Sequence, residues 1–142
     1  MFFLTDQDID PQELSKLLAD PKAGALSTFE GWVRNHHKGQ GVLKLHYQAY
    51  NTLAKKEGMR VINEAKHKFE ILSAVVVHRV GELDIGGVAV WVGVSSEHRQ
   101  AGLEACRFII DEIKKSVPIW KKEFYKEGSS EWVAVHHSNQ YV

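Results

Sequence analysis

The sequence predicts one α+β domain in which antiparallel strands and two long helices share a core. Long helical patterns near residues 52–69 and 98–117 are mixed with short alternating stretches that pair like hairpins. The strict strand–helix alternation of a doubly wound sheet is not seen. The 142 residues contain no repeat or low-complexity segment and suffice for one core, so we expect residues 1–142 to form a single domain.

The N-terminal region predicts a short strand at residues 2–5 and a helix at residues 10–19. Asp10 can cap this helix, because its carboxylate can accept from the free N–H groups of the first turn. Pro11 suits the first helical position, and Pro21 lies just beyond the end.

Alternating side chains predict two further strands, at residues 24–33 and 42–50. The polar, glycine-containing segment 34–41 between them is interpreted as a mobile surface loop. Residues 52–69 then predict a helix. Its expected buried side consists of Leu53, Met59, Ile62 and Ala65.

Two β-branched runs at residues 74–80 and 88–94 predict strands around the turn signal Gly86-Gly87. The remaining strand predictions are residues 119–125 and 132–135, on either side of a turn at 128–130.

The second long helix begins near His98, where Ser95 and Ser96 can cap it, and Pro118 ends it. Apolar residues recur along it at steps of three and four, as expected for one buried face. This stripe consists of Leu103, Cys106, Ile110, Ile113 and Val117.

Charge and composition narrow the functional classes. The 18 basic residues balance the 18 acidic ones, so no overall field selects nucleic acid or a membrane surface as partner. The single cysteine excludes an internal disulfide framework and suits a reducing compartment. The N-terminus does not read as a signal peptide, and no apolar stretch is long enough to span a bilayer. We therefore expect a soluble, cytoplasmic protein.

Lys114 and Lys121 are the first candidates for chemistry. Lys114 borders the buried stripe of the second helix, and apolar neighbours lower the pKa of a lysine toward a useful range. Pro118 then turns the chain so that Lys121 can return toward the same pocket. The alternative is an ordinary basic helix end, because cations suit a helix C-terminus.

Other basic residues could hold an anion. His98 and Arg99 stand at a helix N-terminus, where free N–H groups and the helix dipole favour negative charge. Arg34 follows the strand at 24–33 and lies beside a loop, and the glycines of this loop could let the loop close over a ligand. Both features also occur on surfaces that bind nothing.

Metal and thiol chemistry are less favoured. The histidine pairs His36-His37 and His136-His137 point to opposite faces of a strand and match no metal-binding motif, so no metal is predicted. Cys106 falls in the apolar stripe and is better interpreted as a core residue than as a nucleophile.

Several short segments occur in an order that is specific as a set, although no single one is decisive. They are Gly24-Ala25, Thr28-Phe29, Gly31, Val33-Arg34-Asn35, residues 78–83, residues 94–99, Asp111, Lys114, residues 118–123, Gly128 and Trp132-Val133. In this order they resemble the family of molybdopterin synthase catalytic (large) subunits over roughly residues 24–133. Near the C-terminus His136 aligns where some relatives place a pocket arginine, and Gly87 and Val88 replace acidic residues.

The resemblance implies an α/β-hammerhead-like fold and a sulfurtransferase that needs no bound cofactor. A small ubiquitin-like subunit would carry a thiocarboxylate on its C-terminal Gly-Gly. Two sulfurs would convert cyclic pyranopterin monophosphate (precursor Z) into molybdopterin, creating the dithiolene of the molybdenum cofactor. Two large subunits would form a central homodimer within a heterotetramer.

The resemblance also assigns roles by position. Catalysis would fall to Lys114 and Lys121, and binding of the anionic substrate to Arg34, His98 and Arg99. Phe29 and Ile110 would line the pocket, part of which would come from the second large subunit. From the residues alone, a non-catalytic module that binds a ubiquitin-like tail remains an alternative, as does a hydrolase or phosphotransferase that uses His98 and Arg99.

Overall fold

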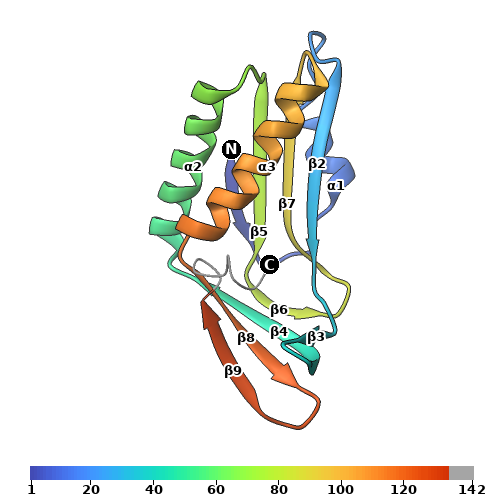
Figure 1. Cartoon of the computed structure of the whole chain (residues 1–142), viewed down its shortest axis with the longest axis vertical. Helices are drawn as coiled ribbons and strands as arrows, with labels where there is room; N and C mark the ends of the chain where they lie inside the picture. Colours follow the sequence, from blue (N-terminus) through green and yellow to red (C-terminus); the bar gives the residue numbers. More distant parts are fainter. Residues whose placement is uncertain (135–142) are drawn as a thin grey trace.

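The computed structural model describes residues 1–134, which form two sheets and three helices (Figure 1). The first sheet has the strand order β1-β5-β7-β2, and the second has the order β3-β4-β8-β9 with β6 also paired to β4. The strands are β1 (Phe2–Thr5), β2 (Ala25–Trp32), β3 (His36–His37), β4 (Gln40–Ala49), β5 (Ser73–Arg79), β6 (Gly81–Asp84), β7 (Val88–Ser96), β8 (Ile119–Tyr125) and β9 (Ser130–Ala134). The helices are α1 (Pro11–Lys16), α2 (Asn51–Lys68) and α3 (Arg99–Ser116). The mixed α+β class is confirmed, whereas His136, His137 and the predicted strand end at Val135 lie outside the described residues.

The first sheet forms because its central strands are rich in β-branched residues and are covered on both faces. The predicted pairing of β5 with β7 is confirmed as antiparallel. Helices α2 and α3 cover one face (Figure 1), and α1 lies on the other, where Leu18 packs against Val75, Val77 and Trp91. Strand β1 joins β5 in parallel, a pairing the sequence did not predict.

The buried side of α2 differs from the prediction. Leu53 and Met59 are 47% and 37% exposed, so their assignment to the core was wrong. Ile62 and Ala65 are buried as predicted, and Gly58 lies so close to β1 that a Cβ there would collide with the ring of Phe2. The residues buried along α2 are Ala54, Gly58, Val61, Ile62 and Ala65. Close approach of helix and strand therefore requires a residue without a side chain at position 58.

The ends of the other two helices also differ from the prediction. In α1 the Asp10 carboxylate accepts from the N–H groups of Gln12 and Glu13, which confirms the cap, but the helix ends at Lys16. The serine cap of α3 was wrong, because both serines belong to β7 and Ser96 donates its hydroxyl hydrogen bond to the carbonyl of His98.

The start of α3 and one member of its predicted apolar stripe depart from expectation as well. His98 is the N-cap residue and makes no side-chain cap hydrogen bond. Leu103 is 59% exposed, whereas Cys106, Ile110, Ile113 and Val117 are buried as predicted.

The second sheet contains most of the unexpected structure. The segment predicted as a loop forms a tight hairpin, in which His36 and His37 of β3 pair with Gly41 and Gln40 at the start of β4. Its turn places Lys38 and Gly39 at φ 48° and 80°, a conformation that glycine adopts readily. The short strand β6 was missed because its four residues follow β5 after only Val80.

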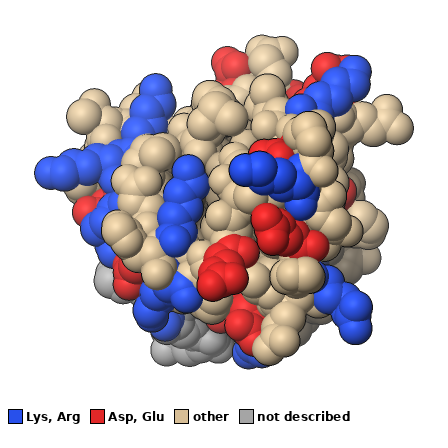
Figure 2. Space-filling view, turned by 90° about the horizontal axis from the view of Figure 1, so that it is seen from above, with Lys and Arg blue, Asp and Glu red and all other residues tan. Residues whose placement is uncertain are grey.

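The fold brings the two sheets together at the C-terminal end of α3. Only Val117 and Pro118 separate α3 from β8, so the helix leads straight into the second sheet (Figure 1). Figure 2 shows one end of the molecule, where basic and acidic side chains are intermingled. In the described part of the chain, no helix is long and apolar enough to span a membrane.

We predict that Ile62→Ala lowers the free energy of unfolding by about 2–5 kcal/mol, because Ile62 is fully buried and the change leaves a cavity. Leu53→Ala on the same helix should cost only about 0.5 kcal/mol. Urea unfolding of both variants measures the difference. Equal losses would contradict the observed orientation of α2.

Candidate active site

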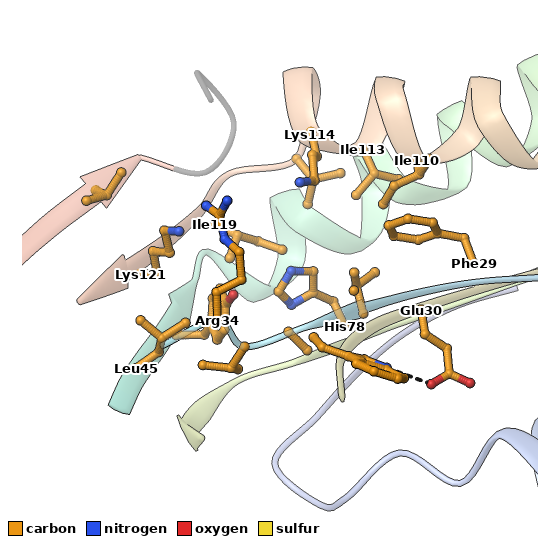
Figure 3. Close-up of a pocket in the computed structure, with 18 of the residues that line it drawn as sticks. Phe29, Glu30, Arg34, Leu45, His78, Ile110, Ile113, Lys114, Ile119 and Lys121 are labelled. Atoms are coloured by element: carbon orange, nitrogen blue, oxygen red, sulfur yellow. Dashed lines mark hydrogen bonds between the residues drawn. The ribbon is translucent and has the colours of Figure 1, made fainter. Parts of the chain in front are cut away.

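A cavity of about 320 Å³ opens where the two sheets meet the end of α3 (Figure 3). It is walled by side chains from β2, β4, β5, β7, β8 and α3. At its rim the Glu30 carboxylate accepts a 2.9 Å hydrogen bond from the indole N–H of Trp32, which is 67% exposed. Segments far apart in the sequence therefore converge on one concave site, as is usual for small-molecule pockets.

Lys114 and Lys121 both line this cavity, as the sequence predicted. Lys114 lies in the last turn of α3 beside the buried Ile113, and Lys121 lies on β8 with 17% of its side chain exposed. Pro118 in the short connection directs β8 back along β4, where Lys121 stands opposite Tyr47. The two ammonium groups thus reach one pocket from a helix end and from the strand that follows it.

Arg34, Phe29 and Ile110 complete the set of predicted residues that the cavity brings together. Phe29 extends from β2 and Ile110 from α3, and together they form an apolar part of the wall. Arg34 follows the end of β2 and lies between the two sheets, close to Lys121 in Figure 3. An anion in this cavity would face three cationic side chains with an apolar wall beside them.

The environment of Lys114 supports a chemical role over an ordinary helix end. Burial lowers the pKa of Lys114, and the positive charges of Lys121 and Arg34 lower it further, although Asp111 opposes them. An amine whose pKa moves toward neutrality can both give and take a proton.

Lys121 belongs to a buried polar cluster centred on Glu123, which is 2% exposed. Glu123 Oε2 lies 3.6 Å from Lys121 Nζ, and its Oε1 lies 3.7 Å from His37 Nε2. The Tyr125 hydroxyl donates to Oε1 over 3.2 Å. Burial lowers the pKa of Lys121, and the nearby negative charge of Glu123 opposes that shift, whereas Asp111 opposes the shift of Lys114.

His98 and Arg99 do not line the cavity within this chain. They stand exposed at the N-terminal end of α3, about 22 Å from Lys114 along a helix that rises about 1.5 Å per residue. They lie next to the start of β2, because the carbonyl of Ser96 accepts from the N–H of Gly24. The cavity is beside the opposite end of the same strand.

Thiol and metal chemistry find little support in the described residues. Cys106 is buried, and burial raises the pKa of its thiol to about 11, which keeps it protonated and unreactive. Across residues 1–134 no group of three histidine, cysteine or acidic side chains is placed to hold a metal ion.

Sequence analysis assigned no role to several polar residues of the site, among them His78, Glu123 and Tyr47. The signal for Glu123 was available, since it lies two residues after Lys121 on a strand and must share its face. His78 and Tyr47 could not be found in this way, because only the meeting of the two sheets places them beside Lys114.

We predict that Lys121→Met raises the pKa of Lys114, because it removes a neighbouring positive charge from a partly buried amine. Lys115→Met provides the matched control, since Lys115 is exposed and pairs with Glu112. NMR titration of ¹³C-labelled lysine side chains measures the shift. A Lys114 pKa that responds equally to both variants would contradict direct coupling across the cavity.

Comparisons with known proteins agree with this geometry. The family model described as "MoaE protein" matches residues 4–116. The chain is 44% identical over 129 residues to the molybdopterin synthase catalytic subunit of Thermoplasma volcanium, covering 91% of this chain and 94% of that protein.

Solved structures show the same fold. The molybdopterin synthase structure from Staphylococcus aureus superposes with a TM-score of 0.87 at 34% identity, covering 92% of this chain and 95% of the other. A chain from the complex of subunits 1 and 2 of the Helicobacter pylori molybdopterin-converting factor shares the fold at a TM-score of 0.74 and 21% identity, covering 94% and 88%. The chain therefore belongs to the MoaE family, the family of molybdopterin synthase catalytic subunits, which are enzymes that transfer sulfur.

Proposed function

We propose that this chain transfers sulfur from the C-terminal thiocarboxylate of a small ubiquitin-like subunit to cyclic pyranopterin monophosphate, forming the dithiolene of molybdopterin. The observation that carries this proposal is the convergence of Arg34, Lys114 and Lys121 in one partly buried cavity. Both reactants are anions, one through its thiocarboxylate and the other through its cyclic phosphate. A chain without net charge must concentrate positive charge locally to hold them together.

The two lysines suit different tasks in this reaction. The thiocarboxylate sulfur would attack an oxygen-bearing side-chain carbon of the pterin, so that a C–S bond forms and a C–O bond at that carbon breaks, its oxygen leaving with a proton or on the phosphate. Water would then add to the acyl carbon and break the acyl–sulfur bond, which leaves the sulfur on the pterin and releases the small subunit as a carboxylate. We assign proton donation and acceptance to Lys114, because burial and like charges lower its pKa. Lys121, beside the Glu123 carboxylate, would remain charged and stabilise the acyl and phosphate oxygens. A second thiocarboxylated subunit would supply the second sulfur.

The proposed partner is a small subunit that inserts its extended tail into the cavity. The Helicobacter pylori protein of the same fold was solved as a complex of two different subunits, which supports such a pairing. An extended Gly-Gly tail is narrow enough to reach a recessed site beside Lys114. We also place the reaction in the cytoplasm, where a reducing environment suits the free thiol of Cys106.

We further propose that two copies of this chain pair across β2 and complete each other's sites. In the described part of the chain β2 is an edge strand, and its Leu26 and Trp32 are 48% and 67% exposed. His98 and Arg99 lie near the start of β2, whereas the cavity lies near its end. A two-fold axis across the strand would therefore bring these residues of one copy toward the cavity of the other.

We predict that Lys114→Ala lowers dithiolene formation by at least about a hundredfold, the usual scale for a lost acid–base group. The assay combines cyclic pyranopterin monophosphate with the thiocarboxylated small subunit. Lys115→Ala, one residue away on the exposed face, is the control and should retain activity.

The same assay separates an enzyme from a binding module. A folded wild type that binds the small subunit but yields no product would contradict the synthase function and favour a non-catalytic module. Unchanged turnover by Lys114→Ala would instead move the acid–base role to another residue.

Mixed dimers test the shared site. Lys114→Ala and Arg99→Ala should each be inactive, but re-associated mixtures should recover about one quarter of wild-type activity, since half of the dimers are mixed and each has one intact site. Mixing Lys114→Ala with Lys121→Ala is the control and should recover nothing, because both lysines line one chain's cavity. Recovery in neither mixture would place Arg99 outside the partner's site.

A further inference from the structure

His78 is a polar residue in an otherwise apolar stretch of the first sheet. It follows three consecutive valines on β5 and is only 4% exposed, yet it lines the cavity. Figure 3 shows its ring in the middle of the site, beside Arg34 and beneath Lys114. A histidine that only stabilised the fold could be surrounded by protein on all sides, whereas this ring is part of the cavity wall.

The backbone fixes which nitrogen of His78 carries the proton. Nδ1 lies 2.7 Å from the carbonyl oxygen of Arg79, and a carbonyl can only accept, so Nδ1 is the donor. In the neutral ring Nε2 is then an unprotonated acceptor, and it has no hydrogen-bond partner among residues 1–134. The ring of Tyr47 packs edge-on at 5.0 Å and holds the imidazole plane in place.

Burial, together with the positive charge of Lys114, keeps His78 neutral. Burial lowers its pKa to about 4, and the positive charge of Lys114 acts in the same direction, although the bond to Arg79 opposes them. A protonated imidazole would add a fourth positive charge beside Arg34, Lys114 and Lys121. At neutral pH the ring therefore presents a lone pair rather than a charge.

Side-chain acceptors are few in the rest of the cavity, and the Glu30 carboxylate at its rim already accepts from the indole N–H of Trp32. Arg34 and the charged forms of Lys114 and Lys121 are donors only. The Glu123 carboxylate is an acceptor, but it already faces Lys121, His37 and Tyr125. A substrate with ring N–H or hydroxyl groups as well as an anionic group needs an acceptor apart from the cations.

We propose that Nε2 of His78 accepts a hydrogen bond from an N–H or O–H group of the pterin substrate, which makes His78 a substrate-binding residue. This inference rests on the proposed function and adds to it a neutral recognition point. The cations would hold the anionic groups of the reactants, and His78 would orient the uncharged part of the pterin.

Two substitutions separate this role from a purely structural one. His78→Phe keeps a ring against Tyr47 but removes the acceptor, and it should raise KM for cyclic pyranopterin monophosphate about tenfold, the scale of one neutral hydrogen bond. His78→Gln offers an amide oxygen near the place of Nε2 and should stay within about threefold of wild type. KM for the small subunit should not change in either variant. His67→Phe, an exposed histidine on α2, is the control.

The KM values of both variants are compared with that of the wild type. Product from wild type with an unchanged KM in His78→Phe, or an equal loss in the Phe and Gln variants, would overturn the inference and leave the proposed function intact. Absence of product from wild type would instead count against the function itself.

A second measurement covers the case in which His78→Phe does not fold. It uses ¹⁵N NMR of the His78 ring in Lys114→Ala protein. The Nε2 resonance should move upfield when the pterin is added, and an unmoved resonance in the bound state would overturn the inference.

Discussion

Repulsion between like charges is the constraint on which this site depends. Arg34, Lys114 and Lys121 are brought together at a partly buried cavity, and each lysine loses proton affinity through burial first and through neighbouring positive charge second. The fold balances this cost with one deeply buried carboxylate, Glu123, rather than with several surface ion pairs. That carboxylate lies 3.6 Å from the ammonium group of Lys121, whereas the negative charge that opposes the pKa shift of Lys114 is that of Asp111, so each lysine has its own counter-charge.

The architecture supports this charge arrangement with rigid elements. Lys114 is held by a helix whose neighbouring residues are buried, and Lys121 by a strand paired on both sides, with β4 and β9. Val117 and Pro118, which join these elements, are both buried and allow little adjustment. Preorganised groups of this kind need not be reoriented as charge develops during a reaction.

The sequence predicted most of the elements, because they depend on local pattern. From the position of Pro118 and the buried stripe of α3, the sequence predicted that Lys114 and Lys121 share one pocket. Both lysines line the cavity. The features that the sequence did not predict depend on tertiary packing. Leu53 and Leu103 fit a helical stripe as well as their neighbours do, and only tertiary contacts, such as the close approach of Phe2 to Gly58, show which side of each helix is buried. Likewise, a run of polar residues with two glycines predicts a loop unless its pairing with the start of β4 is known.

The candidate site shows the same limit. Arg34, Phe29, Ile110 and both lysines line one cavity, whereas His98 and Arg99 stand at the far end of α3. Similarity to a family assigns residues to a common site without stating which copy of the chain supplies them. Helix length limits what one copy can supply, because one rigid helix cannot place both of its ends in the same pocket.

The uncapped start of α3 has a consequence for the evolution of stability. Serine, threonine or aspartate at an N-cap position typically stabilises a helix by about 1 kcal/mol, and position 98 carries a histidine that forms no such bond. Ser96, two residues earlier, is committed to the carbonyl of His98 and cannot serve instead. A better cap at position 98 would therefore be an easy gain in stability, but it would replace a side chain proposed to bind substrate. The start of α3 is thus a place where selection for a more stable fold and selection for activity would oppose each other.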